Sequence, residues 1–104
     1  MASTKEYLAY ILDQLDGIEG ISYRTMMGEY ILYCRGRIFG GIYDNRFLVK
    51  PTQSAEKLMP DAQRELPYEG AKEMLSVTDT DDRILLKRLV EAMYDELPEP
   101  KKKK

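Results

Sequence analysis

The chain has 104 residues, of which 43% are hydrophobic and 33% charged, and this suits one compact domain, expected over residues 1–97. No apolar run reaches the roughly 20 residues of a membrane-spanning helix, and the N-terminus is too polar for a secretory signal, so we expect a cytoplasmic protein without membrane contact. One cysteine and no histidine exclude an internal disulfide and the usual zinc sites.

Charge is unevenly distributed along the chain. Because four of the sixteen basic residues are Lys101 to Lys104, residues 1–100 hold 12 basic and 18 acidic side chains, a balance of −6. Such a domain is a poor electrostatic match for a phosphate backbone, which argues against a dedicated DNA-binding protein. Residues 98–104 are expected to be a disordered, solubilising Pro/Lys tail; the alternative is an electrostatic tether to nucleic acid or an acidic partner.

A helix is predicted near the N-terminus, because Ser3 and Glu6 have the spacing of a capping box. Behind them, apolar side chains recur at helical intervals on one face: Tyr7, Leu8, Ile11, Leu12 and Leu15. Asp16-Gly17 ends this helix. The alternating stretch 21–26 is then expected to add a strand to the sheet that follows.

Three β-rich runs and two tight turns occupy residues 28–50. The runs 30–34, 38–43 and 47–49 are joined by Arg35-Gly36 and Asp44-Asn45, which tolerate the positive φ that two-residue hairpins require. This spacing predicts an antiparallel meander. Inside the second run, Gly40-Gly41 indicates a bulge or a close backbone approach rather than a phosphate-binding loop, because no helix follows it.

The second half of the chain contains two further helical signals. Thr52 is expected to cap a short helix that ends before Pro60, and the stretches 66–68 and 74–77 are expected to be strands, the first at a sheet edge. A last helix begins at the acidic cluster 79–82, with Asp79 as its cap and Asp82 as its third residue. Its apolar stripe consists of Ile84, Leu85, Leu89, Met93 and Leu97.

These elements predict an α+β fold of two layers, in which an antiparallel sheet of four to six strands carries the N- and C-terminal helices on one face. Continuous alternation places these side chains under the helices: Ile31, Tyr33, Ile38, Ile42, Phe47 and Val49. The opposite face then gathers a second set: Tyr30, Leu32, Arg37, Phe39, Tyr43, Arg46, Leu48 and Lys50.

This second set is too apolar for an ordinary wetted sheet face and too basic for a dry core, so we expect it to bind a partner. Two other interpretations remain open. The last helix covers part of this face, or a bulge at Gly40-Gly41 shifts the alternation of the third strand.

No group of residues indicates catalysis, a cofactor or a metal ion. The carboxylates 79–82 lack the glycine and glutamate positions of a calcium-binding loop and suit a helix start instead. Arg35 and Arg37 beside Cys34 favour a thiolate, but no histidine is present to act as base, so a structural cysteine is the simpler interpretation. We therefore expect a protein that is not an enzyme.

Three spaced motifs stand out in the chain: Arg24-x-Met26-Met27-Gly28, Leu32-Tyr33-x-Arg35-Gly36-x-Ile38-Phe39 and Asp44-x-Arg46-Phe47-Leu48-Val49-Lys50. They resemble the motifs R-x-M-F-G-G, G-L-Y-x-D-G-x-x-F and D-x-x-L-Y-x-K of the N-terminal domain of the TfoX/Sxy family. Pro67-Tyr68-Glu69-Gly70 resembles the family's proline-aromatic turn. The resemblance covers nearly the whole chain and implies that residues 1–97 form a TfoX N-terminal-like domain without catalytic residues or cofactor.

Two departures from the family pattern stand out. Met27-Gly28-Glu29 replaces the usual Phe-Gly-Gly, and nothing in the sequence corresponds to the helical C-terminal domain of full-length regulators.

The founding members of that family regulate natural competence by helping a cyclic-AMP receptor protein activate transcription. The resemblance thus implies a regulatory or adaptor domain that acts by protein–protein interaction. The alternative is a single-stranded nucleic-acid-binding module, because bases stack on aromatic side chains that stand among basic ones. We expect a monomer or a weak homodimer, since a two-fold dimer built on the predicted face would oppose Arg37, Arg46 and Lys50 to their own copies.

Overall fold

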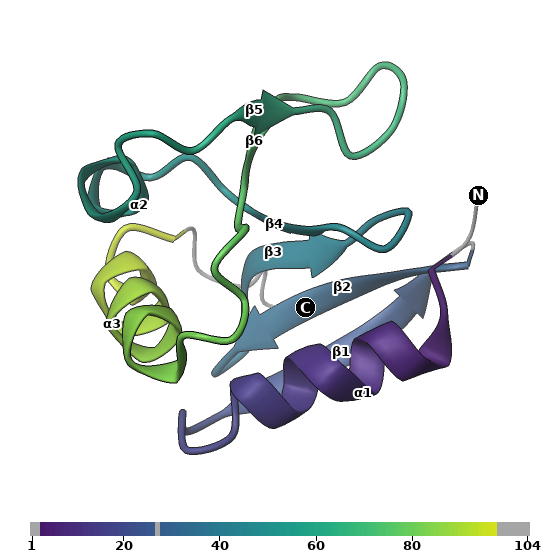
Figure 1. Ribbon diagram of the computed structural model, residues 1–104, viewed down its shortest axis with the longest axis horizontal. Coiled ribbons are helices and arrows are strands. Elements are labelled where there is room, and N and C mark those ends of the chain that lie inside the picture. The colour runs from purple at the N-terminus through teal and green to yellow at the C-terminus, as the bar shows by residue number, and fades with distance from the viewer. Residues whose placement is uncertain (1–2, 27, 98–104) are drawn as a thin grey trace, which may run out of the picture.

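The computed structural model describes residues 3–26 and 28–97 (Figure 1). In chain order the elements are α1 (Lys5–Gln14), β1 (Ile21–Met26), β2 (Glu29–Cys34), β3 (Arg37–Ile42), β4 (Phe47–Val49), α2 (Gln53–Leu58), β5 (Arg64–Glu65), β6 (Met74–Ser76) and α3 (Arg83–Tyr94). Within these residues six strands form one antiparallel sheet in the order β1-β2-β3-β4-β6-β5. The predicted α+β fold is confirmed. The expected tail, 98–104, lies outside the described residues.

Helix α1 starts one residue later than the capping-box pattern predicted. Its cap is Thr4, whose hydroxyl accepts a hydrogen bond from the Tyr7 N–H at 3.1 Å. Ser3 instead joins the helix to the sheet: its hydroxyl donates to Glu29 at 2.6 Å and accepts from the Asn45 N–H at 3.0 Å. The residue that was expected to cap the helix therefore fixes the position of the helix on the sheet.

Helix α3 also differs from its prediction at the start and along one side. Asp82, not Asp79, is the cap, and its carboxylate accepts from the Leu85 N–H at 3.0 Å. Ile84 is 74% exposed and does not belong to the apolar stripe. The buried side chains of the helix are Leu86, Leu89, Val90 and Met93.

The two tight turns of the meander form as predicted. Arg35 and Gly36 have φ values of 51° and 85°, and Asp44 and Asn45 have φ values of 53° and 55°. Positive φ at both central residues is the type I′ geometry, whose twist matches that of the strands it joins. Three of these residues are not glycine, so the hairpins stabilise a conformation that such residues rarely adopt.

A β-bulge interrupts the alternation between β2 and β3. Tyr33 pairs with Ile38, whereas Leu32 pairs with Gly40, so Phe39 is the extra residue on β3. Every pair beyond this point is shifted by one residue. The bulge that the sequence left open as an alternative is therefore present, one residue before Gly40-Gly41.

This shift exchanges parts of the two predicted faces. The sheet residues of the hydrophobic core, on the helix face, are Tyr30, Leu32, Cys34, Phe39, Ile42, Phe47, Val49 and Leu75. The opposite side, called the outer face below, carries Ile31, Tyr33, Ile38, Tyr43 and Leu48. The prediction that Tyr30, Leu32 and Phe39 lie on an exposed face is wrong, because all three are buried under the helices.

The two glycines of β3 lie where neighbouring atoms leave no room for a side chain. A Cβ atom on Gly40 would overlap the carbonyl oxygen of Leu48 in the next strand. A Cβ atom on Gly41 would lie 2.6 Å from the Tyr43 ring, which covers that position on the outer face. The close backbone approach predicted from the glycine pair is thus confirmed.

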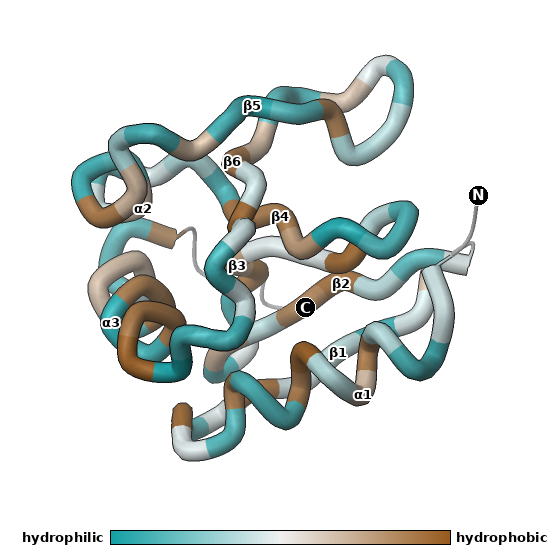
Figure 2. Tube along the Cα trace, viewed as in Figure 1, coloured by the Kyte–Doolittle hydropathy of each residue, from teal (hydrophilic) through white to brown (hydrophobic). Residues whose placement is uncertain are grey.

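One hydrophobic cluster joins the helices to the sheet. It includes Leu8, Ile11 and Leu15 near α1, Ala55 of α2, and the buried side chains of α3. Figure 2 shows hydrophobic stretches along α1, α3, β2 and β4, whereas β5 is largely hydrophilic. The N- and C-terminal helices therefore pack on the same face of the sheet, as predicted.

The region between β4 and α3 agrees with its prediction except at the sheet edge. Thr52 caps α2 by accepting from the Ala55 N–H at 3.2 Å, and β6 lies within the predicted stretch 74–77. The edge strand, however, is Arg64–Glu65 rather than 66–68, because Pro67 lacks the N–H that a strand ladder needs. No helix among the described residues is long and apolar enough to cross a membrane.

Candidate functional site

Most of the residues predicted to bind a partner have other roles in the structure. Leu48, like Tyr30, Leu32 and Phe39, is buried. Arg37 lies on the helix face, where its guanidinium stacks 4.3 Å from the centre of the Tyr94 ring and donates to the Tyr94 carbonyl at 2.9 Å. The idea that the predicted residues share one exposed surface is therefore wrong.

Two of them, Tyr43 and Lys50, do meet at a cavity of about 370 Å³ on the outer face. We call it the outer-face pocket. Its lining includes the side chains of Ile38, Tyr43, Lys50, Pro67, Tyr68, Lys72, Glu73 and Met74. It is a cavity that two of the predicted partner-binding residues line together.

One wall of the outer-face pocket comes from the loop between β5 and β6. This loop carries Pro67, Tyr68 and Lys72 across the outer face, and the Tyr68 ring centre lies 6.2 Å from that of Tyr43. Tyr68 remains 58% exposed. A side chain of a partner protein can pack on an exposed aromatic ring that stands beside a cavity.

Arg46 holds this loop in place. Its guanidinium donates to the Glu65 carboxylate at 2.6 Å, to the Leu66 carbonyl at 3.1 Å and to the Tyr43 carbonyl at 3.1 Å. The predicted partner-binding residue Arg46 thus joins both sides of the outer-face pocket. Its donors are used within the fold, and it acts by positioning Tyr43 and the loop.

The charged side chains that line the outer-face pocket are Lys50, Lys72 and Glu73, so positive charge is in excess. Burial lowers the pKa of Lys50 below its ordinary value, and the nearby positive charge of Lys72 lowers it further. Neither lysine forms an ion pair with any residue of the described ranges 3–26 and 28–97. Two neighbouring ammonium groups without a carboxylate partner favour the binding of an anion.

Tyr43 supplies a neutral donor at the same cavity. Burial raises the pKa of its phenol, and the neighbouring groups Tyr68, Glu29 and Tyr33 raise it further. The hydroxyl therefore stays protonated well above neutral pH. It can donate a hydrogen bond to an acceptor that enters beside the lysines.

Cys34 lies on the helix face, away from the outer-face pocket. Its thiol is buried and lies 3.7 Å from the Glu19 carbonyl oxygen. Burial raises the pKa of the thiol; Arg35 opposes this effect and Glu91 adds to it. A thiol with a raised pKa is a poor nucleophile at neutral pH, which agrees with the structural role expected for this residue.

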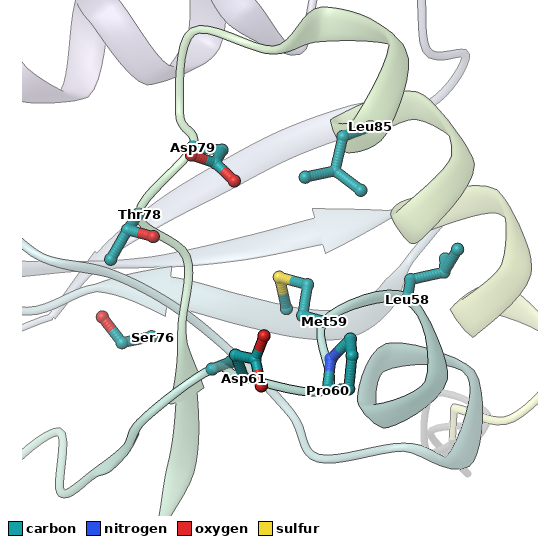
Figure 3. Close-up of a pocket in the computed structure, with 9 residues that line it drawn as sticks. Leu58, Met59, Pro60, Asp61, Ser76, Thr78, Asp79 and Leu85 are labelled. Atoms are coloured by element: carbon teal, nitrogen blue, oxygen red, sulfur yellow. The ribbon is translucent and has the colours of Figure 1, made fainter.

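A second cavity, of about 240 Å³, lies between α2, β6 and the start of α3 (Figure 3). Its apolar side is formed by Leu58, Met59 and Leu85, and its other side carries Asp61 and Asp79 together with two hydroxyl side chains. No basic residue lines it. The two cavities therefore have opposite charge, and only the outer-face pocket contains residues predicted from the sequence to bind a partner.

The half of the outer-face pocket that comes from the loop between β5 and β6 is not predicted from the sequence. The stretch 66–68 is predicted as an edge strand, Pro67-Tyr68-Glu69-Gly70 resembles the family's proline-aromatic turn, and no role is predicted for Lys72. Pro67 and the Glu69-Gly70 turn indicate a loop, yet only the long-range contacts of Arg46 show that the loop folds over the outer face.

The fold and the outer-face pocket define a small α+β domain with an open antiparallel sheet, covered by helices on one face. This chain belongs to the TfoX N-terminal domain family, which it matches over residues 13–96, so the predicted family is confirmed. It is also 30% identical over 105 residues to a Spirochaeta aurantia protein named "Uncharacterized 12.7 kDa protein in trpE 5'region", with 100% of this chain and 91% of that protein covered. No solved structure matches the chain.

Proposed function

We propose that this TfoX N-terminal domain is a non-enzymatic regulatory or adaptor domain, and that its outer-face pocket binds an acidic segment of a partner protein. The observation that supports the proposal is the pair Lys50 and Lys72, which line this cavity together with the single carboxylate Glu73 and form no ion pair among the described residues.

A carboxylate from a partner would improve the electrostatics of both lysines. Lys50 is already partly desolvated in the folded protein. An incoming anion therefore forms a charge-assisted hydrogen bond in a site that is partly shielded from water. The Tyr68 ring and the Met74 side chain offer apolar area to the residues that flank the carboxylate. An acidic residue between apolar ones is therefore the sequence that suits this pocket.

Affinity capture from a lysate of the source organism, followed by mass spectrometry, tests the proposal. A protein recovered with the wild type should be lost with the double variant Lys50→Glu/Lys72→Glu, because the reversed charges repel an acidic segment. It should be retained with Lys87→Glu/Arg88→Glu, which makes the same change of charge at exposed positions of α3. Equal recovery with all three proteins would refute the pocket as the binding site.

The regulatory part of the proposal rests on the family. Its founding members act on transcription through a partner protein, so we expect the captured protein to belong to the transcription machinery. Recovery of a pocket-dependent partner with no connection to gene expression would retain the adaptor role and remove the regulatory one.

A single-stranded nucleic-acid-binding module is the second candidate, because the exposed ring of Tyr68, packed beside the buried Tyr43, stands at a cavity with two lysines. Base stacking on tyrosine rings and phosphate contacts to lysine would make binding strongly salt-dependent. Fluorescence anisotropy with labelled oligonucleotides at low salt measures this directly. Binding that is lost with Tyr68→Ala would favour this candidate, and no binding at tens of micromolar protein would eliminate it.

A further inference from the structure

Strand β1 forms one edge of the sheet and is unusually open. It is six residues long, and five of its residues are exposed. The other edge, β5, has only the two charged residues Arg64 and Glu65. Proteins usually protect a sheet edge by keeping it short, charged or covered, and β1 has none of these features except for Arg24.

The hydrogen-bonding groups that β1 leaves open can be identified from its pairing with β2. The Arg35 N–H donates to the Gly20 carbonyl at 2.8 Å, so this pair is hydrogen-bonded. The bonded pairs of an antiparallel ladder then alternate, which directs the backbone groups of Ser22, Arg24 and Met26 toward β2. The N–H and C=O groups of Ile21, Tyr23 and Thr25 point out from the sheet edge.

Helix α1 lies beside β1 (Figure 1), and side chains of both elements line a groove next to this edge. Its volume is about 550 Å³, and Lys5 is the one charged residue among those that line it. Tyr23 stands in the groove 46% exposed, with its ring edge-on to that of Tyr30 at 5.9 Å between centres. Apolar side chains and open backbone groups therefore lie next to each other.

We propose that β1 pairs antiparallel with β1 of a second copy of this chain, across a two-fold axis at Tyr23, so that one sheet continues through both copies. The three outward residues are placed symmetrically about Tyr23. The axis therefore pairs Tyr23 with its own copy, and Ile21 with Thr25 of the second copy, in hydrogen-bonded positions.

The side chains of β1 suit this two-fold arrangement. On the helix face, Ile21 would lie opposite Thr25 of the second copy, and Tyr23 would lie opposite its own copy. A pair of β-branched side chains and a pair of aromatic rings are both favourable across two strands. On the outer face, Arg24 would lie opposite Ser22 of the second copy, so no like charges meet. A dimer through β1 therefore does not bring Arg37, Arg46 and Lys50 against their own copies. That repulsion was the argument against a dimer on the face predicted from the sequence.

The charges at the two ends of α1 favour a second copy over an unrelated strand. Lys5 is the first residue of α1, and Asp16 lies in the turn that follows its C-terminal end. A two-fold axis reverses the direction of α1 in the second copy. Lys5 of each copy then lies toward Asp16 of the other, and the groove's positive charge meets a negative one.

Disulfide trapping tests the register directly. In a hydrogen-bonded antiparallel pair the facing Cα atoms are about 5.5 Å apart, so Tyr23→Cys should give a covalent dimer on a non-reducing gel. Ser22→Cys is the matched control, because the axis offsets the two copies of residue 22 beyond the reach of a disulfide. The native Cys34 is buried and does not contribute. Equal cross-linking of both variants, or none in either, would overturn the proposal.

Analytical ultracentrifugation across micromolar concentrations tests the interface without a cross-link. Tyr23→Pro removes an outward N–H while leaving the pairing with β2 intact, and it should raise the dimer dissociation constant by about tenfold or more. Tyr23→Lys should do the same by placing two ammonium groups at the axis, and circular dichroism will show whether either variant is folded. Tyr68→Ala should leave the dimer unchanged. A wild type that stays monomeric would overturn the proposal and leave the edge to a strand of another protein.

Discussion

The two faces of the sheet carry similar side chains but have different environments. On β3, Phe39 is fully buried under the helices, while its neighbour Ile38 lies at the outer-face pocket. On β4, Phe47 and Val49 face the helices, and Leu48 between them lies on the outer face, where it is also buried. The comparison shows that the type of residue does not decide its face here. The bulge at Phe39 decides it, because it resets the alternation between β2 and β4.

Removing the bulged side chain should have the largest effect. Phe39→Ala should lower the free energy of unfolding by about 3–5 kcal/mol, because it deletes a fully buried ring from the core. Urea denaturation followed by circular dichroism measures the loss. Ile84→Ala on α3 is the control and should change stability by less than about 0.5 kcal/mol, since Ile84 is exposed. Similar losses in both variants would mean that the bulge does not place Phe39 in the core.

A side chain at Gly40 should break the close approach of β3 to β4. Gly40→Ala places a methyl group against the Leu48 carbonyl and should cost about 1–3 kcal/mol of stability, as overpacking in a well-packed region does. The same denaturation experiment measures it. Gly70→Ala offers a contrast, because its Cβ would meet nothing within 4 Å and its cost would come only from the positive φ of 88°. A Gly40→Ala variant as stable as the wild type would contradict this geometry.

The outer face should be sensitive to the loss of Arg46. Arg46→Ala removes the ion pair with Glu65, in which both side chains are about one-third exposed, and should cost about 1 kcal/mol. A double-mutant cycle with Glu65→Ala separates this pairing from the other contacts of Arg46. A coupling energy near zero would mean that the guanidinium positions the loop through the Leu66 and Tyr43 carbonyls instead.

The smallest expected effect is on the titration of Lys50. Because its pKa in the folded protein lies below the ordinary lysine value, the unfolded chain binds more protons between those two pKa values. The contribution of Lys50 to stability therefore increases as the pH rises through that interval. Lys72→Gln removes one of the two causes and should move the pKa of Lys50 back toward its ordinary value, as measured by NMR titration of its side chain. An unchanged titration would show that burial alone causes the shift.

Local signals predicted most of the fold. The dipeptides Arg35-Gly36 and Asp44-Asn45 specify turns through their own conformational preferences, and Thr52 specifies a helix start through its hydroxyl. Such signals act over a few residues and are visible in the sequence. For α1 and α3 the predicted cap is a close neighbour of the true one: Ser3 instead of Thr4, and Asp79 instead of Asp82.

The faces of the sheet were not predictable in the same way. The residue types from Tyr30 to Val49 do not mark Phe39 as the extra residue of a bulge. Only the geometry around Gly40 and Gly41 in the structure shows where the register shifts. The candidate site depends on the same shift and on a loop held by Arg46 over a separation of about twenty residues. Half of the outer-face pocket therefore comes from contacts that no local pattern specifies.

The contact of Arg37 with the end of α3 has a consequence for the order in which the chain folds. Arg37 donates to the Tyr94 carbonyl across 57 residues, and it is one of the contacts that hold the last turn of the helix against the sheet. During synthesis the meander leaves the ribosome long before this helix does. Its hairpins are local and can pair early, but Leu32 and Phe39 stay without cover until α3 docks. Hydrogen exchange should therefore show protection in β2 and β3 before the amides of α3 become protected.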